Sequence, residues 1–294
     1  MKMTVKLSPD SEGYVGRECP DCKKYFKVKG GTGLPGTPPC HCPYCNHVGA
    51  SNEFVTEDQV EYAKSVVLNK VSSDFLGMMK KVERRPDPRA FISIGIKVTG
   101  KPVPVTRYAE KELEEKVTCS ACTLQYTIYG AFGFCPDCGI HNSRQIANTN
   151  FDLIIRMLDR AKSAPADVAT KTVENALEDA VSCFDGFGRE HCSALAFKVS
   201  FQNIEAARDR LRKEVGLDIA PQDPATWKFI CEQFQKRHLI AHKAGIVDVE
   251  FITRTGALPH LLGRKVVVSE SEVRTLVDEL RCMADRLYQG VLRA

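Results

Sequence analysis

Hydrophobic residues recur with helical spacing through the second half of the chain. Apolar positions three or four residues apart line one face of an α-helix. Five segments show this spacing, at residues 154–158, 168–184, 204–211, 227–240 and 273–283. No tandem repeat or low-complexity tract interrupts them. The pattern therefore predicts an all-α helical bundle over residues 143–294.

The first half of the chain has shorter hydrophobic patterns, separated by turn-forming residues. Residues 25–29 alternate like a short strand and lead into a loop rich in glycine and proline. Thr56, followed by two acidic residues, predicts the N-cap of a helix that runs to about Val82, where a proline-containing segment stops it. Apolar residues at alternating positions of 91–99 predict a strand. This half therefore combines short strands with one helix.

Length and charge narrow the class of protein. The 294 residues favour two or three domains. The 41 basic and 37 acidic side chains nearly balance, so any contact with nucleic acid must come from local patches. Residues 1–15 contain no apolar region typical of a secretory signal, and no stretch approaches the roughly 20 apolar residues of a membrane span. We expect a cytoplasmic protein that does not enter a membrane.

The thirteen cysteines indicate metal binding rather than disulfides in such a chain. Eight of them form four CxxC pairs, and these fall into two modules. The first module is Cys19 and Cys22 with Cys42 and Cys45, and the second is Cys119 and Cys122 with Cys135 and Cys138. Each CxxC turn presents two thiolates to one metal, so two turns complete a tetrahedral shell of four sulfurs. We predict two structural Zn²⁺ sites, each without the open position that catalysis at zinc requires.

Three further residues near the first module leave its ligand set partly open. Cys40, His41 and His47 lie within reach of the two CxxC pairs. We assign the ligands to the pairs because both have the form Cys-Pro-x-Cys, and a ligand role for Cys40 or His47 stays as an alternative. Four lysines also surround Tyr25 and Phe26, namely Lys23, Lys24, Lys27 and Lys29. That mixture suits single-stranded nucleic acid, and the alternative is a solvated lysine face over two core aromatic residues.

Together these patterns predict a mixed fold class. Two small β-rich zinc ribbons with a linking helix come first, and an all-α bundle follows. The expected boundaries are 1–55 for the first ribbon, 56–89 for the linking helix, 90–142 for the β segment with the second ribbon, and 143–294 for the helical domain.

The most informative motif lies in the fourth helical segment, at residues 235–242. It places Arg237 and His242 with four residues between them, and His238 beside the arginine. A guanidinium can hold a phosphate and an imidazole can move a proton. On an ideal helix the two positions lie about 140° apart, so they share a cleft only if it is broad or if another helix or subunit closes it. His238 and His242 share a face, but Leu239 stands where an HExxH metallopeptidase has its glutamate.

In its context, this motif resembles the signature of HEPN domains. Residues 234–248 resemble the arginine-to-histidine segment of the family, and residues 177–187 resemble its segment with an inward acid and aromatic residues. The resemblance covers roughly residues 145–290. The N-terminal half is similar to the zinc-ribbon extensions of some bacterial HEPN proteins. Many HEPN domains are metal-independent endoribonucleases that dimerise so that two motifs face each other.

The resemblance implies a role for each residue of the motif. His242 would act as general base or acid on the ribose 2′-OH and the leaving oxygen. Arg237 would clamp the phosphate, and His238 would support or orient it. Lys236 and Lys243 would bind substrate by adding positive potential. The products would be a 2′,3′-cyclic phosphate and a 5′-hydroxyl.

Two alternatives to a ribonuclease stay open. Some HEPN domains are non-catalytic, and the chain would then be a zinc-ribbon module that binds nucleic acid or protein, with a helical bundle for dimerisation. A zinc-ribbon regulator of transcription is the second alternative. Asp185 is either a supporting acid or a residue that caps or solvates a helix. By family analogy we expect RNA as substrate, a homodimer, an antitoxin or trigger protein, and a setting in toxin or anti-phage defence.

Overall fold

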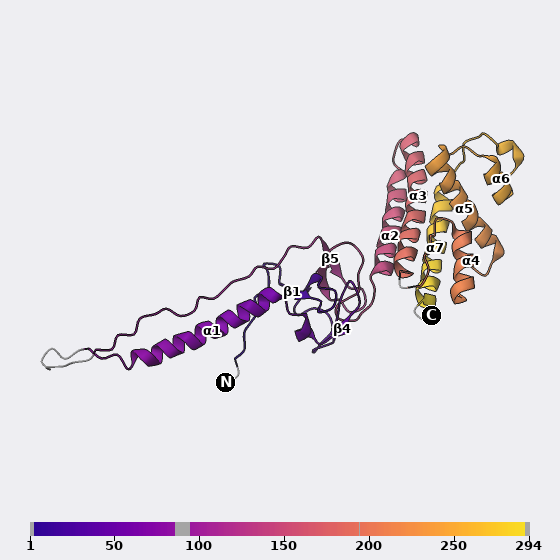
Figure 1. The fold of residues 1–294 in the computed structure, drawn as a ribbon. Helices are drawn as coiled ribbons and strands as arrows, with labels where there is room; N and C mark the ends of the chain where they lie inside the picture. The colour runs from indigo at the N-terminus through magenta and orange to yellow at the C-terminus, as the bar shows by residue number, and fades with distance from the viewer. Residues whose placement is uncertain (1–2, 86–94, 194, 292–294) are drawn as a thin grey trace, which may run out of the picture. The chain divides into compact units, whose positions relative to one another are not determined.

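The chain consists of a strand-containing unit followed by a helical one. The structure is a computed structural model, and it describes residues 3–85, 95–193 and 195–291. The chain divides into two compact units, Met1–Ile140 and His141–Ala294. All the described strands and one long helix belong to the first unit, whereas the second is helical (Figure 1). A small antiparallel sheet region thus precedes a helical region, as the predicted mixed fold class requires.

Both cysteine modules of the first unit contribute strands to one sheet. Its four antiparallel strands follow the order β1-β2-β6-β5, with bounds β1 Tyr14–Glu18, β2 Tyr25–Lys29, β5 Glu115–Thr118 and β6 Gln125–Ile128. The two modules meet where β2 pairs with β6, with Val28 opposite Tyr126. The strand predicted at residues 25–29 is therefore confirmed, and it joins the two ribbons, which the sequence pattern had treated as separate domains. The short strands β3 (Cys40–His41) and β4 (Val48–Gly49) pair with each other.

The long helix α1, Glu57–Lys80, begins with a reciprocal cap. The Thr56 side chain accepts a hydrogen bond from the Gln59 backbone N–H, and the Gln59 side chain accepts one from the Thr56 N–H. This confirms the predicted N-cap. Gln59 also donates to the backbone carbonyl of Gly16, which fixes the start of the helix to strand β1. A short 3-10 helix, Ser51–Phe54, precedes it.

The strand predicted at residues 91–99 lies largely outside the described residues. In the described part, Ile96 pairs with Arg84 in an isolated antiparallel bridge. The chain then returns alongside α1, because the Asn69 side chain donates to the carbonyl of Val103 and the Ser72 hydroxyl accepts from the Val103 N–H.

In the described part of the second unit there are six α-helices: α2 Ser143–Ala161, α3 Ala166–His191, α4 Ile204–Val215, α5 Pro224–Lys243, α6 Val249–Thr255 and α7 Glu270–Val291. Helix α3 packs against α2, α7 and α5, so it forms the centre of the bundle. The five predicted helical segments correspond to α2, α3, α4, α5 and α7. The short α6 and a 3-10 helix at Pro259–Leu261 were not predicted. No described helix is both long and apolar enough to cross a membrane.

A cluster of aromatic residues fixes the loop that precedes α4. Phe201, in this loop, packs edge-on against Phe184 of α3, with ring centroids 5.5 Å apart. A Cβ atom at Gly188 would come within 2.4 Å of the Phe201 ring, so only glycine allows this approach. The buried carboxylate of Asp185 accepts a hydrogen bond of 2.7 Å from the Phe201 N–H. Residues 200–203 are thereby anchored to the central helix.

Candidate metal centres and candidate active site

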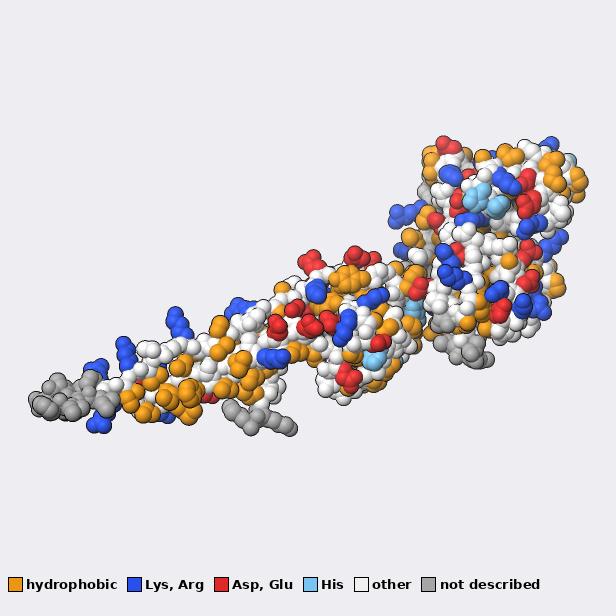
Figure 2. Space-filling view, in the orientation of Figure 1, with side chains coloured by type: hydrophobic (Ala, Val, Ile, Leu, Met, Phe, Trp, Pro, Cys, Tyr) orange, Lys and Arg blue, Asp and Glu red, His pale blue; other side chains and the backbone are white. Residues whose placement is uncertain are grey.

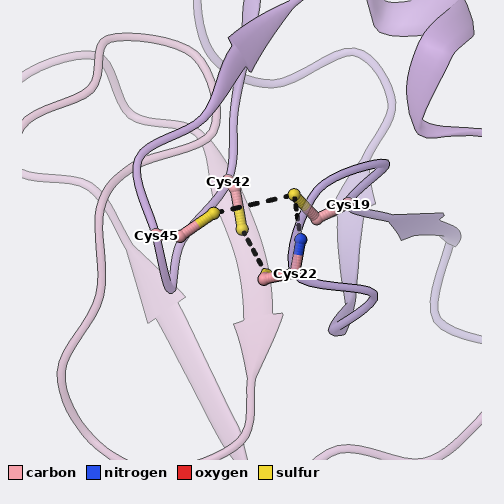
Figure 3. A group of neighbouring side chains, drawn as sticks. All are labelled: Cys19, Cys22, Cys42 and Cys45. Carbon is pink, nitrogen blue, oxygen red and sulfur yellow. Dashed lines mark hydrogen bonds between the residues drawn. The ribbon is translucent and has the colours of Figure 1, made fainter.

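The first cysteine module brings four sulfurs together in one group. The Sγ atoms of Cys19, Cys22, Cys42 and Cys45 all lie within 4.8 Å of one another. Cys19 and Cys45 are 3.7 Å apart, and Cys22 and Cys42 are 3.6 Å apart (Figure 3). A tetrahedral shell with metal–sulfur bonds of about 2.3 Å has sulfur–sulfur edges of about 3.8 Å. The spacing suits one shared metal ion and is far longer than the roughly 2.05 Å of a disulfide.

The second module forms an equivalent group. The Sγ atoms of Cys119, Cys122, Cys135 and Cys138 also lie within 4.8 Å of one another. Cys119 and Cys138 are 3.7 Å apart, and Cys122 and Cys135 are 3.4 Å apart. Both sets of four predicted ligands are therefore assembled, and each can hold a metal ion.

All four CxxC turns have the same backbone geometry. The residue after the second cysteine has a left-handed conformation in each turn: Lys23 at φ 58°, Asn46 at 55°, Thr123 at 64° and Gly139 at 68°. Its N–H donates to the carbonyl of the first cysteine, at 2.9–3.0 Å in every case. The N–H of the first cysteine in turn donates to the carbonyl five residues later. Three non-glycine residues thus adopt a conformation that costs about 1 kcal/mol or more, which indicates that the turn itself is held tightly.

The neighbouring Cys40, His41 and His47 lie outside the metal-binding group. Burial raises the pKa of the Cys40 thiol to about 12, which keeps it neutral. The His41 ring packs against Gly139, and its Nδ1 lies 3.2 Å from the side-chain oxygen of Asn46. His47 packs on the Phe54 ring, with centroids 5.9 Å apart. The assignment of the ligands to the CxxC pairs therefore agrees with the geometry.

The lysine-rich surface of the first module does not expose its aromatic residues. Tyr25 is 7% exposed and Phe26 is fully buried. Lys27 is also buried and forms an ion pair of 2.6 Å with Asp10. Because bases stack only on accessible rings, this geometry favours the alternative of core aromatic residues beneath a lysine face.

The arginine–histidine motif lies at the C-terminal end of α5. Arg237, His238 and His242 all line one hollow of about 330 Å³. Its other walls come from Ser200, Gln202 and Asn203 of the anchored loop and from Glu250 and Arg254 of α6. Figure 2 shows histidine side chains at the surface of the helical unit, with basic and acidic side chains around them. Arg237 and His242 lie on different sides of α5, and they line one hollow because the loop at residues 200–203 and helix α6 form its remaining walls.

Arg237 has one buried donor atom without a partner in the described part of the chain. Its Nε atom is buried and has no hydrogen-bond partner among the described residues. Buried guanidinium donors are ordinarily paired, because an unmade hydrogen bond is costly. A phosphate or carboxylate in the hollow would supply the missing acceptor.

The two histidines lie side by side at the edge of the hollow. Their ring centroids are 5.0 Å apart and their planes are tilted by 56°. Partial burial lowers the pKa of His238, and the positive charges of His242 and Lys243 act in the same direction against the carboxylates of Glu250 and Asp248. His238 therefore stays neutral to more acidic pH than a free histidine, and in that form it can accept a proton.

The two lysines of the motif do not join this group. Lys236 is buried and forms ion pairs with Glu272 of α7, at 2.6 Å, and with Glu232, at 3.4 Å. Lys243 pairs with Asp248 and, at 3.7 Å, with Glu250. Neither lysine lines the hollow. Both lysines are therefore engaged in ion pairs, Lys236 with α7 and Lys243 with residues 248 and 250, and their substrate-binding role stays a prediction.

Arg254 is a cation of the hollow that the motif did not indicate. It comes from α6 and lines the hollow opposite the motif. Its guanidinium lies 3.1 Å from Glu250 and 4.0 Å from Glu205. The only signal in the sequence was an i, i+4 pair of Glu250 and Arg254, which is indistinguishable from an ordinary surface pair.

Asp185 serves the hollow indirectly. Its carboxylate is buried, lies 3.1 Å from Arg189 and accepts from the Phe201 N–H. It does not line the hollow, but it anchors the loop that does. A comparison of the chain with protein-family models, with curated proteins and with solved structures finds no match.

Proposed function

We propose that this protein is a metal-independent endoribonuclease of the HEPN type, with two cysteine groups that hold structural Zn²⁺. One observation carries the proposal: an arginine, with a buried Nε that has no hydrogen-bond partner among the residues described, and two adjacent histidines line the same hollow. An anion site beside two imidazoles, which can accept and donate protons, is what cleavage of RNA by its own 2′-OH requires.

The reaction needs one group to take a proton and another to return one. His238, with its lowered pKa, suits the base that removes the proton from the ribose 2′-OH. The 2′ oxygen then attacks phosphorus, and His242 protonates the leaving 5′ oxygen. Arg237 holds the phosphate and stabilises the charge that builds on it, with Arg254 as a second cation. The products are a 2′,3′-cyclic phosphate and a 5′-hydroxyl.

Zinc is the metal proposed for both cysteine groups. Four thiolates at tetrahedral spacing match the closed shell of structural zinc sites. Each ion would stabilise the fold of the first unit and would take no part in catalysis. Elemental analysis of purified protein is expected to find two zinc ions per chain, and iron or another metal in their place would contradict this assignment.

RNA as substrate, a homodimer, and an antitoxin or trigger protein follow from the family resemblance. The same holds for a cytoplasmic location and a role in toxin or anti-phage defence. In a dimer, two hollows would face each other, and each copy would supply one set of Arg237, His238 and His242.

The test is cleavage of mixed cellular RNA in the presence of EDTA, with end-group analysis of the fragments. We expect the wild type to cut and leave cyclic phosphate, and His242→Ala or Arg237→Ala to lose at least about 100-fold in rate. His260→Ala is the matched control, because His260 is exposed on a different segment outside the hollow. Zinc content is measured in parallel, so that loss of the metal is not mistaken for loss of a catalytic group.

A second candidate is a non-catalytic binding module. Glu250 lines the same hollow and its carboxylate would repel a phosphate, which favours this reading. It predicts that folded, zinc-loaded wild type binds RNA or protein without cutting RNA. Equal cutting by wild type and His242→Ala would instead point to a different site or a contaminating nuclease.

A further inference from the structure

The second half of α1 presents a row of exposed apolar side chains. Leu68 is 54% exposed, Val71 54%, Phe75 55%, Met78 60% and Val82 57%. In Figure 2, hydrophobic side chains gather along this helix. Single exposed hydrophobic residues are common on proteins, but a continuous row of large ones marks a surface that another molecule covers. We name these five residues the α1 seam.

The spacing of the α1 seam is that of a coiled coil. Its members follow one another at intervals of three, four, three and four residues, which are the a and d positions of a heptad repeat. The first four lie within α1, and Val82 follows in the turn after Lys80. On an ideal helix all five fall within about 80° of one another, so they form one narrow stripe.

The described parts of the chain do not cover this stripe. The returning segment uses a different face of α1, where its backbone hydrogen-bonds to Ser65, Asn69 and Ser72. The N-terminal segment, with Met3, Val5 and Leu7, borders an apolar groove beside the first half of the helix and reaches no further than Leu68. The stripe from Leu68 to Val82 is left for a partner.

We propose that the α1 seam pairs with the same seam of a second copy, in antiparallel orientation. In the matching register, Phe75 packs on Met78 of the second copy, and Val71 packs on its Val82. The charges flanking the stripe support this arrangement. Asp74 and Lys81 occupy the same heptad position, one heptad apart, and positions of that kind face each other in antiparallel pairs. Asp74 therefore meets Lys81 of the second copy, and by symmetry this happens twice.

A parallel pair would fit the same residues less well. It would place Asp74 beside Met79 of the other copy, where its charge is not matched. It would also bring together two basic ends, each with Lys80, Lys81, Arg84 and Arg85. The antiparallel pair holds these ends apart, which removes the repulsion. The pairing depends on the first unit alone and is independent of the proposed nuclease.

The test is the mass of the full-length, metal-loaded protein, measured by light scattering and sedimentation from micromolar to submillimolar concentration. We expect an association step that depends on the α1 seam and in which the mass at least doubles. Phe75→Glu places a charge in the middle of the stripe, so it is expected to weaken that step at least about tenfold. Ser73→Glu adds the same charge to the exposed opposite face of α1 and is expected to leave the step unchanged. Circular dichroism verifies that both variants keep the helix.

A charge exchange tests the orientation. Asp74→Lys and Lys81→Glu each create a like-charged pair, so each is expected to weaken association by about two- to tenfold. The double variant re-forms both pairs with reversed signs and is expected to restore it. Failure of the double variant to rescue would overturn the antiparallel pairing.

Two results would overturn self-association altogether. The first is identical mass for the wild type and Phe75→Glu at every concentration. The second is a protein that lacks the association step but co-sediments with vesicles of anionic phospholipid through Phe75, since the row would then be a membrane contact. Any dimer formed by the helical unit would persist in Phe75→Glu, so the two sources of association can be told apart.

Discussion

The two units of this protein are stabilised in different ways. Among the described residues, six of the eleven members of the buried cluster in the first unit are cysteines. The buried cluster of the helical unit has 26 members, and Cys192 is its single cysteine. The first unit therefore has few aliphatic side chains to bury around its sheet, and we expect metal ions held by its two cysteine groups to stabilise it. The helical unit has enough apolar surface to fold by packing alone. We therefore expect loss of metal to unfold the first unit and truncation of buried side chains to unfold the helical unit.

Removal of a metal ligand is expected to have the largest effect, and to be confined to the first unit. Cys135→Ser removes one of four thiolates, and a structural zinc site contributes on the order of 10 kcal/mol to folding. We expect one metal ion fewer per chain, loss of hydrogen-exchange protection over β5 and β6, and unchanged protection in α3 and α7. Elemental analysis and hydrogen exchange with mass spectrometry measure these changes.

Cys282→Ser is the control for that change, because Cys282 is exposed and belongs to neither cysteine group. It should leave metal content and protection as they are. If Cys135→Ser also removed protection from α3 and α7, the two units would not be independent in stability.

Truncation in the helical core should produce the opposite result. Phe184 is fully buried and packs against Phe187 and Phe201. Phe184→Ala is expected to destabilise the helical unit by about 3–5 kcal/mol through lost burial and the cavity left behind. Denaturant titration followed by circular dichroism measures the free energy of unfolding of the helical unit. Elemental analysis should still find both metal ions. Loss of metal from Phe184→Ala would contradict the view that the two units are stabilised independently.

Acid should weaken the helical unit through His141. Burial lowers the pKa of His141 to about 4, and its Nδ1 accepts a hydrogen bond from the Ser143 N–H at the start of α2. The unfolded chain has a histidine pKa of about 6.5, so the stabilisation is complete above that pH and is lost as the pH falls toward 4. The loss at pH 5 is expected to be about 1–2 kcal/mol, since Glu190 at 3.6 Å offsets part of the cost.

His141→Asn is the matched variant for this prediction. Its side-chain oxygen can accept the same hydrogen bond but does not titrate. Unfolding midpoints measured between pH 5 and pH 7 should therefore depend less on pH in the variant than in the wild type. If the unfolding midpoints of the two proteins changed equally with pH, His141 would not be the cause of the acid destabilisation.

The smallest expected effect concerns the CxxC turns. Thr123 is β-branched and holds φ at 64°, whereas Gly139 fills the equivalent position of the next turn. Thr123→Gly should relieve this strain and stabilise the first unit by about 0.5–1 kcal/mol. Thermal unfolding of the metal-loaded protein measures the gain. A decrease in the unfolding temperature would show that the Thr123 hydroxyl, which donates to the Cys122 carbonyl at 2.6 Å, matters more than the strain.

Much of the fold followed from local patterns. The strand at residues 25–29, the Thr56 cap and five helices were readable because spacing and capping act within a few residues. Helix α6 was missed because seven residues are too few for a clear period. The pairing of β2 with β6 was missed as well, because nothing in either strand specifies a partner a hundred residues away.

In the candidate site as well, some residues were indicated by the local sequence and others were placed only by packing between helices. The motif brought Arg237, His238 and His242 to attention, since all three lie within six residues of one helix. Lys236 belongs to the same string, yet its burial against Glu272 depends on how α5 and α7 pack. Arg254 enters the hollow only because α6 folds back beside α5.

The sequence by itself determined the two sets of four cysteines, because a CxxC turn closes its own hydrogen bonds and presents both thiolates from four residues. It also determined the helical bundle and the position of the arginine–histidine motif within it. Only the tertiary structure decided that both cysteine modules share one sheet, that Arg254 rather than Lys236 lines the hollow, and that the α1 seam is exposed. The physical reason is that local spacing sets which side chains share a face, whereas burial and ion pairing depend on contacts between segments far apart in the chain.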